Sequence, residues 1–191
     1  MPTLTEVRPV PATPAVPVPA PVPSGAPTVL PDEHTYTADE LFFSTTDSHG
    51  RIRRANSTFM RLSGYPRGAL VGRAHNVVRH ADMPAGLFRS IWDAIEEGRA
   101  ASAYITNRSS DDGHYRVFAT IVPSGSGYLS VRTLPMLTDL RDDIEAAYAR
   151  VRDVEEASTA AGSTRREVAA AGQAAGVGGA CQLVERAGQV G

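Results

Sequence analysis

The sequence contains only one cysteine, Cys181, among its 191 residues. A single thiol can form neither an intramolecular disulfide nor a cysteine-based metal cluster, so neither stabilises the fold. Long hydrophobic runs are also missing, because no stretch approaches the roughly 18 apolar residues of a membrane-spanning helix. Glu6 and frequent prolines interrupt the N-terminus, which lacks the pattern of a secretory signal. We therefore expect a cytoplasmic protein with no membrane span.

An excess of either charge is likewise missing. The formal net charge is −2, and acidic and basic residues are interspersed. Nucleic-acid binding requires clustered basic residues, so no nucleic-acid partner is expected. The sequence has no glycine-rich phosphate loop, no HExxH and no GxSxG pattern, and Cys181 has no histidine near it in sequence. These absences argue against an enzyme.

Proline is abundant, but mainly near the start of the chain. Ten of the 14 prolines lie between Pro2 and Pro31. Proline fixes φ and removes a backbone donor, which excludes helix and sheet interior. Residues 1–34 are therefore expected to form an extended, polyproline-like tether without a fixed fold. The alternative is a ligand for a proline-binding domain.

The middle of the chain begins with a predicted β-hairpin. LFFSTTD and RIRRAN have strand composition, and the turn residues Asp47 to Gly50 separate them. Asn56 or Ser57 then caps a short helix that Gly64 ends. Pro66 is expected at the first helical position of another short helix.

A longer helix follows the start signal Asp82-Met83-Pro84, with Asp82 as the capping residue. Its apolar residues recur at helical spacing: Leu87, Phe88, Ile91, Trp92 and Ile95. Three strands come next, at 103–108, 114–122 and 128–133, separated by Gly-containing turns. Alternation in the second of them puts four side chains on one face: Tyr115, Val117, Ala119 and Ile121.

The predicted order is therefore two strands, several helices and three strands. Such an order favours an α+β fold over residues 35–135, with a five-stranded antiparallel sheet and helices across one face. A hollow between sheet and helices is a natural ligand pocket.

After Pro135 the pattern changes to that of an amphipathic helix over 136–157. Its apolar residues step by three and four: Leu137, Leu140, Ile144, Ala147, Val151 and Val154. A seam of about two and a half heptads predicts a homodimer through the Leu137–Val154 helix. The alternative is a helix that covers its own domain. Residues 158–191 are rich in Ala and Gly and are expected to form a low-complexity tail.

Several motifs in the middle of the chain resemble the PAS domain of bacterial aerotaxis receptors. The early ones are STTD, ANSTF, SGY, LVG and HNVVRHADMP, and the later ones are NRSSDDGHYRVFATIVP and GYLSVRT. The ten residues HNVVRHADMP carry the most weight, because ten residues of mixed chemistry rarely coincide. The resemblance implies a PAS fold and a sensory, signal-transducing role, with dimerisation through the PAS domain and a downstream signalling protein that the sequence does not identify.

The same resemblance implies non-covalent FAD that reports redox or oxygen state. Carried over residue by residue, it implies a set of site residues: Asn56, Arg79, His80, Asp82, Trp92 and Asn107. Arginine offers a fork of donors for an anionic group, and asparagine offers both a donor and an acceptor. The alternatives are a haem-binding PAS domain with His75 or His80 as axial ligand, and a cofactor-free interaction module.

Two positions depart from the family pattern. Ala101 and Arg116 stand where the family usually has tryptophan. Losing two aromatic side chains removes contact surface for a flat ring. Three outcomes follow: weaker flavin binding, compensation by Tyr104 or Phe118, or loss of the cofactor.

Overall fold

The computed structural model describes residues 32–135 and 141–177. Residues 1–31 of the expected tether, Leu137 and Leu140 of the seam, and Cys181 in the tail lie outside the described residues. The strands are β1 (Phe42–Asp47), β2 (Ile52–Ala55), β3 (Ala101–Arg108), β4 (His114–Ser124) and β5 (Gly127–Thr133). The helices are α1 (Ser57–Ser63), α2 (Arg67–Leu70), the 3₁₀ helix η1 (His75–Val78), α3 (Ala85–Glu96), α4 (Arg141–Ala160), α5 (Arg165–Gly172) and the π-helical turn η3 (Gln173–Val177).

All five strands form one antiparallel sheet in the order β2-β1-β5-β4-β3. The early hairpin joins the three late strands because β1 pairs with β5, where Phe42 lies opposite Arg132. The α+β fold and the five-stranded sheet expected from the sequence are thereby confirmed.

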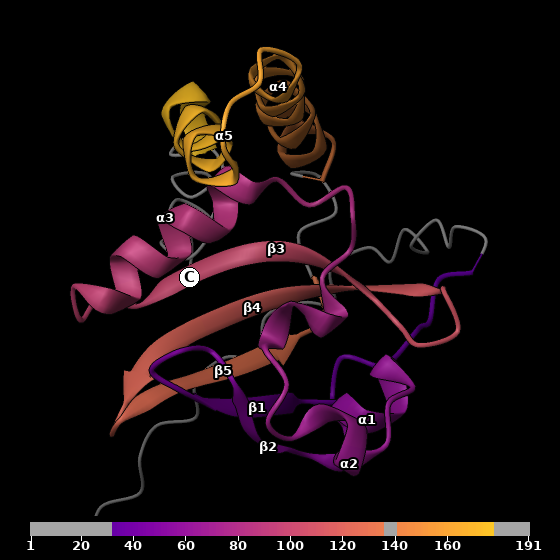
Figure 1. Cartoon of the computed structure of the whole chain (residues 1–191). Coiled ribbons are helices and arrows are strands. Elements are labelled where there is room, and N and C mark those ends of the chain that lie inside the picture. Colours follow the sequence, from indigo (N-terminus) through magenta and orange to yellow (C-terminus); the bar gives the residue numbers. More distant parts are fainter. Residues whose placement is uncertain (1–31, 136–140, 178–191) are drawn as a thin grey trace, which may run out of the picture.

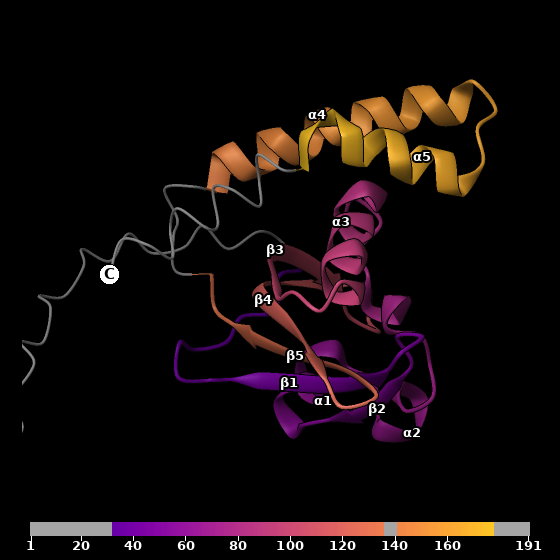
Figure 2. The ribbon, with the colours of Figure 1, turned by 90° about the vertical axis from the view of Figure 1, so that its left-hand side faces the viewer.

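Helices α1, α2 and α3 lie along one side of the curved sheet (Figures 1 and 2). α1 and α2 contact the β1–β2 end, and α3 contacts β3 and β4. The apolar core between them includes these fully buried side chains: Phe42, Phe59, Leu70, Leu87, Tyr115 and Val117. Alternation in β4 confirms the expected inner face, since Tyr115, Val117 and Ala119 are all buried.

The start of α1 is fixed by Asn56, as the sequence predicts. Its Oδ1 accepts from the backbone N–H of Phe59 at 3.2 Å and from that of Phe43 at 3.2 Å. Its Nδ2 donates to the carbonyl of Leu41 at 3.2 Å. One amide side chain therefore caps the helix and ties it to β1.

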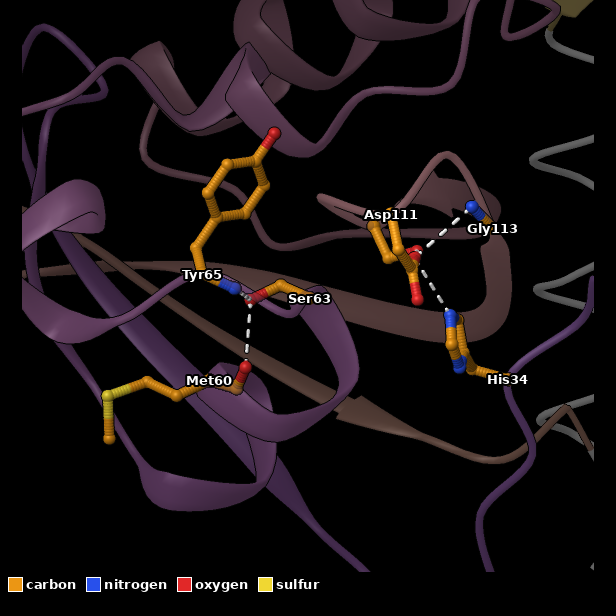
Figure 3. Close-up of polar contacts among 7 residues, drawn as sticks. His34, Met60, Ser63, Tyr65, Asp111 and Gly113 are labelled. Atoms are coloured by element: carbon orange, nitrogen blue, oxygen red, sulfur yellow. Dashed lines mark hydrogen bonds and ion pairs between the residues drawn. The ribbon is translucent and has the colours of Figure 1, made fainter.

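α1 ends at Gly64, whose φ of 68° is left-handed and therefore favours glycine. Figure 3 shows Ser63 Oγ donating to the Met60 carbonyl and accepting from the Tyr65 N–H. The carbonyl of Ser63 also accepts from Ser110 N at 2.8 Å, which places the β3–β4 turn against this helix end.

The β3–β4 turn is closed by Asp111. Its Oδ1 accepts from Gly113 N at 3.2 Å and lies 3.1 Å from His34 Nε2 (Figure 3). The segment before β1 is thereby held against the turn.

Two helix starts differ from the sequence prediction. Pro66 is the N-cap of α2 and not its first helical residue. Pro84 is the N-cap of α3, and Asp82 makes no capping hydrogen bond there. The first backbone N–H groups of α3 instead donate to the carboxylate of Glu155 in α4. Nothing in the sequence near α3 predicts this contact.

α4 and α5 form a helical hairpin beside α3, at the β3 side of the sheet (Figure 2). Of the predicted seam, Ile144, Ala147 and Val151 are buried within the chain's own core, whereas Val154 is 38% exposed. Tyr148 Oη donates to the Tyr104 carbonyl of the edge strand β3 at 2.9 Å. In this structure the helix therefore covers its own domain. Among the described helices, none is long and apolar enough to cross a membrane.

Asn56→Ala is expected to lower the free energy of unfolding by about 2 kcal/mol, the upper end for a helix cap, because three hydrogen bonds are lost. Ser57→Ala, at the next and exposed position, should change it by less than about 0.5 kcal/mol. Urea denaturation followed by circular dichroism measures both. Equal stabilities of the two variants would contradict the assignment of Asn56 as the cap.

Candidate functional site

A cavity of about 330 Å³ lies between the sheet and the helices. α3, η1, the β1–β2 turn and the inner faces of β3, β4 and β5 surround it. Its volume falls at the lower end of the range of roughly 300–1,000 Å³ that small-molecule sites occupy.

Apolar side chains form two opposed walls of the cavity. From α3 come Phe88, Ile91, Trp92 and Ile95, and from the sheet come Ile105, Ala119 and Ile121. Trp92 meets Tyr128 of β5 edge to face at 5.4 Å between ring centroids. Gly50 lets the β1–β2 turn approach this indole, since a Cβ there would lie 2.9 Å from Trp92 Cζ2. Such walls suit a flat apolar ring.

Polar groups gather at one side of the cavity around Arg132 of β5. Its guanidinium donates to His75 Nε2 at 2.7 Å and to Ser44 Oγ at 3.1 Å. Ser44 Oγ lies 3.0 Å from His75 Nε2. The contacts of His75 Nε2 with Arg132 and with Ser44 Oγ require the neutral Nδ1–H tautomer, in which Nε2 is an acceptor for both groups.

The guanidinium is a buried charge. Arg132 is 4% exposed and, among the described residues, forms no ion pair with a carboxylate. Burial lowers the pKa of Arg132 to about 10, so the group remains a cation at neutral pH. The guanidinium carbon of Arg132 lies 5.1 Å from the Phe59 ring centroid and 5.9 Å from that of Phe42. These cation–π contacts compensate in part for the lost hydration of the charge.

His75 cannot share that charge. Burial and, secondarily, the neighbouring Arg132 cation lower the pKa of His75 to about 3. The imidazole is therefore neutral at physiological pH and serves as an acceptor.

Two more polar groups on the cavity wall have no hydrogen-bond partner among the described residues. They are Asn107 Nδ2, in a residue 4% exposed, and Ser130 Oγ, in a residue 7% exposed. Buried polar groups are nearly always satisfied, and an unsatisfied one marks a place where a ligand or water belongs.

Three of the residues implied by the resemblance, Arg79, Trp92 and Asn107, line this cavity together. The guanidinium of Arg79 donates to the Met83 carbonyl at 2.6 Å and lies 4.4 Å over the Phe88 ring. Arg79 is therefore held in position by the structure itself.

The other three, Asn56, His80 and Asp82, do not line the cavity. Asn56 caps α1. His80 and Asp82 lie in a separate cleft beside α4, where His80 Nδ1 is 3.7 Å from an Asp82 carboxylate oxygen and the His80 ring meets His114 edge-on. The sequence motif thus divides between two sides of the same segment.

The two positions where the family usually has tryptophan differ: Ala101 lies on the inner face of β3, opposite the cavity residue Ile121, whereas Arg116 faces away from the cavity. Arg116 alternates with the inward Tyr115 and Val117, and pairs with Glu33 at 3.6 Å. Tyr104 and Phe118 stack against each other at 5.2 Å and are not part of the cavity wall. Compensation by Tyr104 or Phe118 is therefore wrong, because alternation turns both rings to the other face of the sheet.

Sequence reasoning missed Arg132, Ser44 and Ser130 as site residues. The signal was present in GYLSVRT, where period-two alternation puts Tyr128, Ser130 and Arg132 on one face of the last strand. An arginine at an inward position is a buried charge, and such a charge indicates a function.

This strand order, with helices across one face around a cavity, defines a PAS domain. No family model matches the chain. Over 100 residues, 50% of this chain, the sequence is 41% identical to the aerotaxis receptor of Escherichia coli K12. The resemblance to that receptor's family is thereby confirmed. The match covers 20% of the receptor, so the chain spans about a fifth of that relative's length.

Solved structures with a similar backbone include two LOV structures. The dark structure of the blue-light photoreceptor Aureochrome1 LOV has a TM-score of 0.47 and 19% identity, over 55% of this chain and 86% of that one. A LOV protein of Rhodobacter sphaeroides has a TM-score of 0.46 and 17% identity, over 79% of this chain and 89% of that one. The fold assignment itself rests on the strand order of this chain.

The depressed pKa of His75 predicts a pH-dependent stability. In the unfolded chain His75 binds a proton below about pH 6.5, whereas in the folded chain its pKa of about 3 keeps the imidazole neutral. Stability therefore falls as pH drops, by about 2 kcal/mol between pH 7 and pH 5 from this residue. His75→Gln should remove that part of the slope in urea denaturation, and His49→Gln, at an exposed turn, should keep it. A slope unchanged in His75→Gln would show that His75 is not buried as a neutral ring.

Proposed function

We propose that the chain is a flavin-binding sensory module. In this proposal the cavity binds FAD non-covalently, and the redox or oxygen state of the flavin is reported through the C-terminal helices. The observation that carries the proposal is the buried cation Arg132 in the cavity wall, without a carboxylate partner among the described residues. The similarity to an aerotaxis receptor supports it.

The charge argument comes first. A buried cation costs several kcal/mol unless a partner compensates for its lost hydration. His75 and Ser44 are neutral acceptors and replace only part of it. A ligand that brings electron-rich or anionic oxygen atoms to this wall would supply the rest. The polar edge of a flavin ring carries such carbonyl oxygens and gains negative charge on reduction.

The hydrogen-bonding argument points the same way. A flavin edge alternates acceptors with an N–H donor, and an asparagine amide can match both. Asn107 Nδ2 and Ser130 Oγ line the same cavity with no described partner. The residues present therefore fit the group, and Arg132, Asn107 and Ser130 would hold its polar edge.

The shape argument concerns the remaining walls. The α3 side chains Phe88, Ile91 and Trp92 face Ile105, Ala119 and Ile121 of the sheet across the cavity. A flat tricyclic ring matches this layered arrangement. At about 330 Å³ the cavity suits the ring better than a whole dinucleotide, so the rest of FAD would extend beyond it.

Haem suits this site less well. His75 Nε2 already accepts from Arg132 and faces Ser44 Oγ, which leaves no free lone pair for iron. His80 lies outside the cavity.

Catalysis is not part of the proposal. Within 32–135 and 141–177, no three His, Cys, Asp or Glu residues gather to bind a metal ion. The arrangement binds and orients a ring, and its polar groups respond to the charge on that ring.

The proposal retains the predicted organisation and partners. In this proposal a proline-rich tether predicted over 1–34, a PAS domain over 35–135, a helix over 136–157 and a tail over 158–191 act in the cytoplasm. Residues 32–34 are bonded to His114 at the start of β4, and residues 165–177 of the predicted tail form α5 and η3. The protein forms a homodimer through the PAS domain and the Leu137–Val154 helix, and passes its signal to a further protein. Because Ile144, Ala147 and Val151 are buried here, pairing through that seam requires the helix to leave its own domain.

The test is flavin binding by the full-length protein. Purified protein, or protein reconstituted with FAD, should show flavin absorption bands that stay with it through gel filtration. Colourless protein that takes up no FAD would contradict the proposal and favour the cofactor-free interaction module.

Arg132→Met supplies the residue-level test. It should weaken FAD binding at least about tenfold, since a hydrogen bond to a charged group contributes roughly 1.5–3 kcal/mol. Ligand-free stability should stay level or rise, because an uncompensated buried charge is removed. Arg54→Met, at an exposed position of β2, is the matched control and should leave both unchanged. Isothermal titration calorimetry with FAD, together with urea denaturation, measures the pair. Equal FAD affinity in the two variants would exclude Arg132 from the site.

A further inference from the structure

α3 has two functional faces. One face contributes Phe88, Ile91, Trp92 and Ile95 to the cavity wall. Another side of α3 contacts α5 and η3 of the C-terminal hairpin, and Figures 1 and 2 show that hairpin crossing one end of α3. A ligand that displaces α3 therefore also changes the contacts of α3 with the hairpin, and a movement of the hairpin changes the position of α3 at the cavity.

The N-terminus of α3 has no cap of its own. Pro84 occupies the N-cap position and makes no side-chain hydrogen bond. Glu155 of α4 supplies the acceptors from 70 residues away, with Oε2 bonded to Ala85 N at 2.9 Å and Oε1 to Gly86 N at 2.7 Å. A carboxylate at this position also interacts favourably with the helix dipole. We name this pair of bonds the Glu155 cap.

Two glycines make the approach possible. A Cβ on Gly86 would lie 2.4 Å from Gln173 N and 2.4 Å from the Gly172 carbonyl carbon, both of them backbone atoms. A Cβ on Gly172 would lie 2.1 Å from Glu155 Oε1. The hairpin can therefore pack this closely against α3 only because Gly86 on α3 and Gly172 on α5 have no side chain.

Further polar contacts extend the junction along α3. Gln173 accepts from Arg89 Nε at 2.9 Å and donates to Asp93 Oδ2 at 2.7 Å. Arg152 of α4 donates to the Asp82 carbonyl at 3.1 Å, just before α3. These contacts fix the hairpin to the cavity helix, in addition to the Tyr148 bond to the edge strand β3.

We propose that the Glu155 cap couples the cavity to the α4–α5 hairpin, so that ligand binding and hairpin docking stabilise each other. The identity of the ligand rests on the proposed function; the coupling itself rests on the contacts of α3. Release of the hairpin would uncover Ile144, Ala147 and Val151, which recur at heptad spacing. The partner that fits such a face is the same seam of a second copy of this chain.

The first test uses ligand-free, full-length protein and hydrogen–deuterium exchange read by mass spectrometry. Glu155→Gln should raise exchange of α4, α5 and the first turn of α3 about tenfold, because one charge-assisted pair of bonds is lost. Glu156→Gln, its exposed neighbour, should match the wild type. Equal exchange in the two variants would overturn the proposal, as would an equal rise in β1 and β5, which would indicate general destabilisation.

Gly86→Ala separates undocking from loss of α3. Alanine favours helix over glycine by roughly 1 kcal/mol, so α3 itself should become more stable. Its Cβ nevertheless collides with the α5 backbone. The expected result is faster exchange in the hairpin and in the first turn of α3, with the exchange of the rest of α3 unchanged. An unchanged hairpin in this variant would contradict the close packing on which the coupling depends.

The second test adds FAD. Flavin should slow hairpin exchange in the wild type, and Glu155→Gln should weaken FAD affinity about fivefold, since coupling between two sites is reciprocal. If the wild type binds no flavin, the proposed function is wrong. The ligand-free exchange experiment would then still show whether the Glu155 cap holds the hairpin on α3. Flavin bound equally by wild type and Glu155→Gln would overturn the coupling.

Discussion

A guanidinium group buried beside a cavity sets the requirements for the rest of this domain. Removing a cation from water costs several kcal/mol, and the described residues offer Arg132 neutral oxygens, a neutral imidazole and two aromatic faces in return. The β1–β5 pairing places Arg132 within reach of Ser44, and η1 brings His75 to the same point. The cavity wall is thus strongly polar at one side and apolar on the other two, which is the asymmetry that a flavin ring requires.

α3 connects this site to the end of the described chain. Its apolar residues form one wall of the cavity, and its N-terminal amides depend on a carboxylate of α4. A helix that is capped from outside loses that stabilisation when the capping element undocks. The domain and the hairpin therefore form one cooperative unit, in which the state of the cavity and the position of the hairpin are linked through a short rigid element.

The local signals in the sequence were sufficient for the fold. Alternation in 114–122, the turn residues after Asp47, the Asn56 cap and the helical spacing from Leu87 to Ile95 each depend on neighbours within a few residues. The site was only partly predictable, because its polar groups come from β1, η1, β3 and β5 and meet only through sheet pairing. The same reason explains the wrong cap for α3, since Asp82 is adjacent in sequence whereas Glu155 is adjacent in space. The heptad spacing identified Ile144, Ala147 and Val151 as the apolar face of α4, but Val154 is exposed, and the spacing left open whether that face covers a second copy or its own domain.

The most direct test of the central claim is a crystal structure of the full-length chain with FAD. The account predicts the flavin ring between α3 and the sheet, with its polar edge within hydrogen-bond distance of the Arg132 guanidinium and the Asn107 amide. A flavin bound elsewhere, or an Arg132 whose surroundings do not change when the cavity is filled, would contradict it.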